Sequence, residues 1–160
     1  MLDGYARGLT LAAAIGAGIT TGVYFAFSTF VMTGLRRLSH AQSIAAMNAI
    51  NKAAPNPLFM LALFGTGAVS TALSIVALRH LDEPWATYLV IGSALYLVCV
   101  VVTMAYHVPH NDALARIDPR APNAGNAWSR YHSPWTACNH LRTVTALGST
   151  TSFILALRAR

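Results

Sequence analysis

Charged residues are scarce in this chain. Asp, Glu, Lys and Arg make up only 10% of its 160 residues, against about 25% in soluble domains. This scarcity excludes an ordinary soluble domain, and the 55% share of hydrophobic residues predicts a protein that resides in lipid. Four long apolar runs use nearly the whole length, so we expect one membrane domain over residues 1–160 and no separate soluble module.

Acidic residues are absent from every apolar run, and cysteine is almost absent from the chain. A di-iron carboxylate bundle needs several inward Glu residues, so that class is excluded. Cys99 and Cys138 lie at different expected depths, which argues against a disulfide, and no Cys-x-x-Cys motif is present. The net charge of +6 comes from basic residues spread over segment ends, so we expect no nucleic-acid partner.

The apolar runs predict an all-α integral membrane protein. Four spans, at about 8–32, 58–78, 84–107 and 134–157, have the roughly 20 residues needed to cross a bilayer. Their connections make neighbours antiparallel, which predicts an up-down four-helix bundle. Ser133 and Pro134 are suited to the cap and first turn of the last span.

A short helix is expected after the first span. Ser39 is a typical N-cap, and the segment that follows, to about Ala54, is too short and too polar to span. We interpret it as an interfacial helix lying on the bilayer, with a lid over a site as the alternative.

The basic residues weakly favour one orientation. Loops one and three carry six of them and the opposite side carries four. The positive-inside rule then places loops one and three in the cytoplasm, with the protein in the cell inner membrane. The sequence leaves the oligomeric state open and is compatible with a homo-oligomer.

One end of the expected bundle gathers the unusual polar residues. Trp135, Asn139 and Arg142 follow at i, i+4 and i+7 and share one helix face. A charge at the depth of Arg142 is costly and normally faces a partner or a wet cavity. One interpretation pairs it with Asp112. The other makes Asn139 and Arg142 donors to an oxygen atom of a substrate.

The histidines at the end of span three have three open interpretations. His107 and His110 could simply face water or headgroups. With His140 or His40 they could hold a metal such as copper or iron. They could also act as a general base, for which histidine is the usual residue near neutral pH.

The residues also resemble a known family. The evidence is the run Pro109-x-Asn111, the Gly22-Val23-Tyr24-Phe25 and Asn56-Pro57 runs, and the later residues Trp128, Tyr131, Trp135, Asn139 and Arg142. This set resembles the anthrone oxygenase-like family of small four-span membrane proteins, over nearly the whole chain. The resemblance implies oxidation of polyketide anthrones to anthraquinones by molecular oxygen, with no cofactor. His107 and His110 belong to this chain's own pattern.

Together these features predict a membrane-embedded oxygenase or oxidase, of monooxygenase type, for a flat phenolic or anthrone-like substrate. Its partners would be a hydrophobic aromatic molecule, molecular oxygen and membrane lipid. The expected catalytic residues are His107, His110, Asn139 and Arg142, and the expected substrate-binding residues are Tyr24, Asn111, Trp128, Tyr131 and Trp135. Two alternatives remain: a non-catalytic membrane subunit that binds lipid, quinone or metal, and an oxidase with copper or iron on His107, His110 and His140.

Overall fold

The computed structural model describes residues 4–159, and all the regular structure in this range is helical. The elements are α1 (Gly4–Ala26), η1 (Phe27–Val31), α2 (Met32–Leu35), α3 (His40–Ala53), α4 (Pro57–Met60), η2 (Leu61–Gly65), α5 (Thr66–Leu78), α6 (Pro84–Val102), η3 (Thr103–His107), α7 (Val108–Ala115) and α8 (Ala124–Arg158). The three η elements are π-helical segments, each joining two α-helices into one continuous rod.

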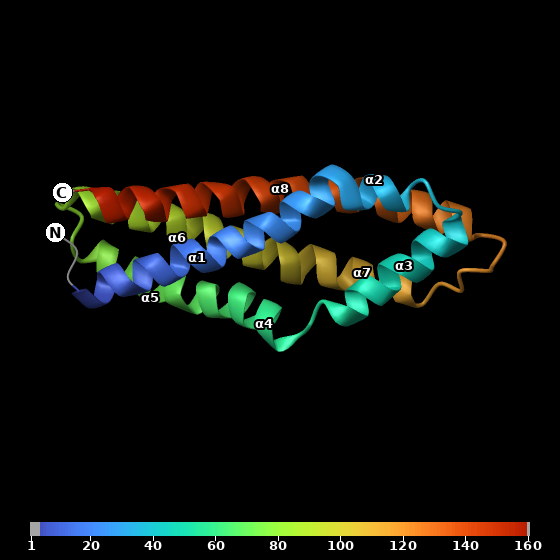
Figure 1. Cartoon of the computed structure of the whole chain (residues 1–160), viewed down its shortest axis with the longest axis horizontal. Helices are drawn as coiled ribbons and strands as arrows, with labels where there is room; N and C mark the ends of the chain where they lie inside the picture. The colour runs from blue at the N-terminus through green and yellow to red at the C-terminus, as the bar shows by residue number, and fades with distance from the viewer. Residues whose placement is uncertain (1–3, 160) are drawn as a thin grey trace.

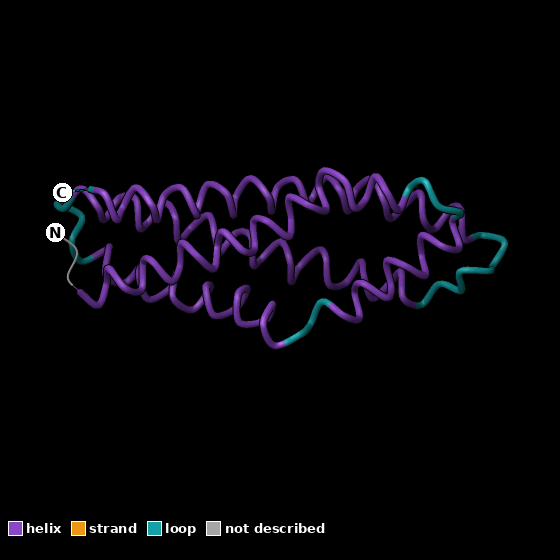
Figure 2. The backbone as a smooth tube through the Cα atoms, viewed as in Figure 1, coloured by secondary structure: helices purple, strands orange, loops and turns teal. Residues whose placement is uncertain are grey.

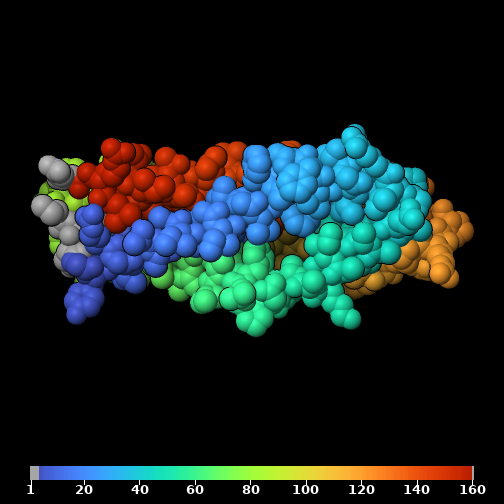
Figure 3. All heavy atoms as spheres, in the orientation of Figure 1, coloured from blue at the N-terminus to red at the C-terminus, as the bar shows by residue number. Residues whose placement is uncertain are grey.

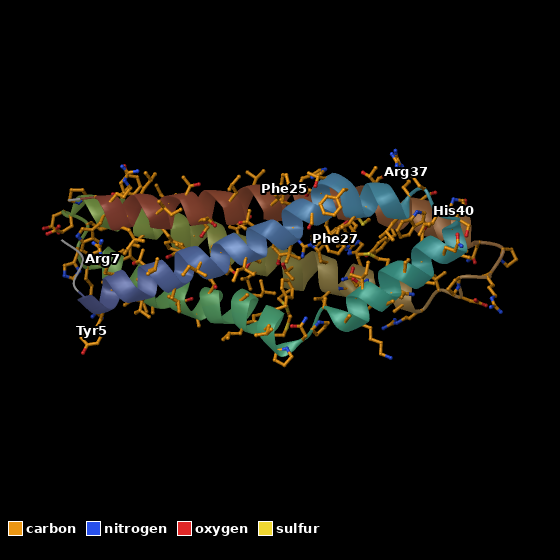
Figure 4. All side chains as sticks on the ribbon, viewed as in Figure 1. Tyr5, Arg7, Phe25, Phe27, Arg37 and His40 are labelled. Carbon is orange, nitrogen blue, oxygen red and sulfur yellow. The ribbon has the colours of Figure 1, made fainter. Side chains whose placement is uncertain are left out.

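The rods lie side by side in an elongated molecule (Figure 1). The start of α1 and the end of α8 share one end with the α5–α6 turn, whereas α2, α3 and α7 gather at the other. Loops occupy the two ends, except for the α3–α4 connection, which lies part-way along the side (Figure 2). Tyr5 and Arg7 mark the first end, Arg37 and His40 mark the second, and Phe27 lies between them (Figure 4).

Within residues 4–159, three rods are long and apolar enough to cross a membrane: Gly4–Leu35, Pro57–Leu78 and Pro84–Ala115. Large apolar side chains cover their outer surfaces, including Ile15, Ile19 and Val101. Outward apolar side chains are expected where the surrounding medium is lipid. The chain is therefore an integral membrane protein. The predicted fourth span lies inside α8, which does not belong to this apolar set.

The predicted start of the last helix is wrong. The helix α8 begins at Ala124, and Pro134 lies inside it. A proline inside a helix removes one backbone hydrogen bond, which normally favours a break. Here the preceding turns bury Trp128 and Tyr131 in an apolar cluster with Ile44 and Met47 of α3. This packing holds the helix on both sides of Pro134.

The helix after the first span is confirmed. Ser39 caps α3 and forms a reciprocal capping box with Gln42. The helix packs on α7 and α8, where the fully buried Ile44 and Met47 share a cluster with Leu114 and Trp128. The Ser43 hydroxyl donates to the Leu35 carbonyl of α2. One face of α3 thus packs on helices of the same chain, and its position on the bilayer stays a prediction.

Small residues set the spacing of the rods. A methyl group added to Gly16 would clash with the Thr66 hydroxyl, and one added to Gly92 would meet the Phe153 ring at 2.9 Å. Gly22 has no atom within 4 Å of such a methyl group. The close approach of α1 to α5 therefore depends on Gly16.

Candidate functional site

A cavity of about 650 Å³ lies between α1, α3, the α4–η2 segment and α7. Figure 3 shows it as a hollow bordered by α1, α3 and the α4–α5 region, with atoms of the α6–α7 rod at its floor. Most of its surface is apolar, and each π-helical segment contributes to the wall. The wall residues from these segments are Phe27, Leu63, Phe64, Thr103, Met104 and His107.

The π-helical segments are held by polar side chains from other rods or from the segment itself. The Tyr96 hydroxyl donates to two carbonyl oxygens in η2, at 3.0 and 3.2 Å. Asn139 donates to the Tyr24 carbonyl oxygen in the last turn before η1. His107, at the end of η3, bonds the Val102 carbonyl five residues earlier. Segments of this kind are frequent at functional sites, because they re-aim side chains.

Arg142 is the central polar residue of the cavity wall. Its side chain is 5% exposed, and its guanidinium carbon lies 4.1 Å from the Tyr24 ring centroid and 5.3 Å from that of Trp135. Nη2 donates to Asn139 Oδ1 at 2.7 Å and Nη1 to Thr103 Oγ1 at 3.3 Å. Nε is buried and makes no hydrogen bond. A guanidinium has five N–H donors, so much of its donor capacity is left for a ligand.

No carboxylate compensates this charge. Arg142 makes no ion pair within the described residues, and Asp112 is an exposed residue at the cavity margin. The interpretation that pairs Arg142 with Asp112 is therefore wrong. The guanidinium is instead stabilised by two neutral oxygens and two aromatic faces, which is weaker compensation than an anion would give.

Asn139 holds the guanidinium in place. It is fully buried, and its amide donates to the Tyr24 carbonyl and to Ser28 Oγ, both at 2.8 Å. Its carbonyl oxygen accepts from Arg142. Both amide hydrogens are thus engaged, so Asn139 has no donor to offer a ligand in this arrangement.

His107 and His110 are placed differently. His107 is 1% exposed and lines the cavity, with its ring edge-on to Trp135 at 4.8 Å between centroids. Its Nδ1 faces the Val102 carbonyl at 3.3 Å. Because a carbonyl only accepts, we assign the proton of the neutral ring to Nδ1, which leaves the lone pair on Nε2. Nε2 is buried and makes no hydrogen bond. His110 stacks on Tyr106 outside the cavity wall.

Asn111 fixes the aromatic wall. Its Oδ1 accepts from Trp135 Nε1 and from the Tyr131 hydroxyl, both at 2.8 Å. The indole N–H can only donate, so this oxygen assignment is unambiguous, and the Asn111 amide N–H₂ group is left for other contacts at the cavity wall. Burial raises the pKa of the Tyr131 phenol above its ordinary value, so it remains a donor.

Metal-binding geometry is not found in residues 4–159, where no three His, Cys, Asp or Glu side chains come together. His140 is exposed, whereas His107 is buried. The residues proposed above for copper or iron thus do not fit a common site in this arrangement.

The fold and the cavity define a helical membrane protein with an aromatic-lined pocket around a buried cation. Comparison with protein families then identifies the group: the anthrone oxygenase family model matches residues 58–152, and the chain belongs to this family. The family suggests an oxygenase-like role. Comparisons with curated proteins and with solved structures gave no match.

Five of the nine expected site residues line the cavity: Tyr24, His107, Asn111, Trp135 and Arg142. Tyr131 and Asn139 lie behind the wall and hold wall residues. Trp128 packs in the α3–α8 cluster and His110 on Tyr106. Sequence reasoning missed Thr103 and Phe27, because their inward direction depends on the π-helical segments.

Proposed function

We propose that the protein is a membrane-embedded oxygenase that oxidises a flat phenolic or anthrone-like substrate with molecular oxygen and no cofactor. The observation that carries this proposal is the uncompensated Arg142 guanidinium in an aromatic-lined cavity. A cation in such a site favours the formation of an anion beside it, because the low dielectric strengthens the attraction.

The ring of the substrate would lie between aromatic walls. Tyr24, Phe27 and Trp135 line the cavity from α1, η1 and α8. Arg142 and the Asn111 amide would donate to the phenolic or carbonyl oxygen. His107 would act as the base, since its Nε2 holds a lone pair with no competing donor.

The chemistry balances with oxygen as the only oxidant. The base removes one proton from the methylene carbon between the two rings, and the resulting anion places charge on the oxygen beside Arg142. The anion gives one electron to O₂, and the carbon radical and superoxide combine and regain the proton as a hydroperoxide. Loss of water then leaves a ketone, so one oxygen atom enters the product and the other leaves in water.

Oxygen uptake and quinone formation with purified protein and an anthrone test the proposal. General base catalysis typically contributes about 10²–10⁴-fold, so His107→Gln should lower kcat by that order. The matched variant His110→Gln should retain turnover, because His110 lies outside the cavity wall.

Two results would count against the proposal. Absence of turnover by the wild type on anthrones and hydroquinones would favour a binding subunit. Loss of turnover with a chelator, restored by copper or iron, would replace the cofactor-free mechanism with a metal-dependent one.

A further inference from the structure

The cavity opens on the side of the molecule that faces lipid. Phe64, Met104 and Val108 line it and are also 43%, 48% and 39% exposed; we call these three residues the mouth. All lie in the two apolar rods Pro57–Leu78 and Pro84–Ala115. Phe64 is seven residues beyond Pro57, so it lies about 10 Å along the rod at about 1.5 Å per residue. The mouth therefore lies part-way along the apolar rod and not at its end.

Polarity changes from one side of the cavity to the other. The margin beside α3 carries the polar residues Asn48, Asn51, Lys52 and Asp112, of which Lys52 and Asp112 are exposed, and the inner wall carries Arg142. The exposed lining residues contributed by η2, η3 and the first turn of α7, which form the mouth, are apolar. A ligand that matches both ends has a polar head near Arg142 and an apolar part at the mouth.

The size of the cavity also exceeds the need of a bare ring system. Pockets for drug-sized ligands measure about 300–1,000 Å³, and this cavity, at about 650 Å³, lies in the middle of that range. A three-ring molecule has fewer heavy atoms than such ligands and would leave part of the space towards the mouth unfilled.

We propose that the natural ligand is an amphiphile: a flat phenolic ring seated at Arg142, with an apolar chain that leaves through the mouth into the bilayer. The ring part rests on the proposed function, and the chain is the new element. Such a ligand would be taken up from the membrane itself.

The test uses two probes that are already oxidised and therefore do not react with oxygen: 1-hydroxyanthraquinone and the same ring system carrying a decyl chain. Quenching of tryptophan fluorescence in lipid nanodiscs reports binding, with each probe counted as its mole fraction in the lipid. Lipid is as apolar as the mouth, so the chain adds little net affinity. The wild type should therefore bind both probes with similar dissociation constants.

Narrowing the mouth should separate the two probes. Val108→Phe, or independently Met104→Phe, should raise the dissociation constant of the decyl probe at least about tenfold, equivalent to about 1.4 kcal/mol. The dissociation constant of the plain ring should not change. Val101→Phe is the matched control, because Val101 is 62% exposed on the same rod and does not line the cavity.

Each other outcome overturns part of the inference. A wild type that binds only the plain ring has no channel for a chain, although the proposed function stands. Equal weakening of both probes would mean that the substitutions disturb the ring site itself, and the assignment of a chain to the mouth would fall. Weak binding of both probes to the wild type removes the ring assignment and the chain together. Unchanged affinity of the decyl probe in both mouth variants would mean that its chain does not pass these residues, which overturns the assignment of a chain to the mouth.

Discussion

Arg142 and Asn139 touch each other, yet their removal should have opposite effects on stability. Burying an ion costs several kcal/mol even after relaxation, and no carboxylate offsets that cost at Arg142 within the described residues. Arg142→Met keeps much of the volume and removes the charge. It leaves the Asn139 carbonyl oxygen unpaired, which costs about 1–3 kcal/mol. The two terms are similar, so the free energy of unfolding should stay level or rise.

Asn139→Ala should behave in the opposite way. It removes the best hydrogen-bond acceptor of the guanidinium, at 2.7 Å, and leaves the Tyr24 carbonyl without its donor. Breaking one partner of a buried charged interaction costs about 3–5 kcal/mol. For a chain of this length, about 2–4 °C per kcal/mol gives a fall in Tm of roughly 6–20 °C.

Thermal melting of both variants and of the double variant in detergent provides the measurement. The double variant should recover much of the loss caused by Asn139→Ala, since the buried charge is then gone. A fall in Tm for Arg142→Met as large as that for Asn139→Ala would refute the reasoning. It would show that the guanidinium stabilises the folded protein, whereas the reasoning requires that its burial lowers the free energy of unfolding.

Two further predictions concern the framework of the cavity. Tyr96→Phe removes the donor that serves two carbonyl oxygens of η2, so it should lower the free energy of unfolding by about 1–3 kcal/mol; an unchanged Tm would mean that η2 does not need this bond. Gly16→Ala should destabilise the protein through its clash with Thr66, whereas Gly22→Ala, with open space around it, serves as the control; equal melting temperatures would show that α1 and α5 can move apart freely.

The sequence predicted those elements whose signals are local. The Ser39 cap and Gln42 lie three residues apart and satisfy each other's backbone groups, so the start of α3 follows from its own residues. The three apolar rods follow from runs of hydrophobic residues. The inward direction of Arg142 follows from the high cost of a charge in lipid.

The parts that sequence reasoning missed depend on distant contacts. A π-helical segment has no strong local signature, and η2 is held by Tyr96, more than 30 residues away. The continuity of α8 through Pro134 likewise depends on aromatic residues buried against α3. Local proline and capping rules were outweighed there by packing between helices.

Several departures from ordinary helix design meet at the level of the cavity. The π-helical segments η1, η2 and η3 all contribute to the cavity wall, together with the uncompensated charge of Arg142 and the unpaired nitrogen of His107. The apolar cluster towards the chain ends, with Ala13, Leu73 and Phe153 fully buried, is all α-helical, and the departures near it are single hydroxyls, those of Ser70, Ser93 and Ser149, which are buried without a hydrogen-bond partner. Natural proteins usually break local rules where function requires it and conform elsewhere. The cost carried at this level is therefore better explained by a ligand that completes the site than by the needs of the fold.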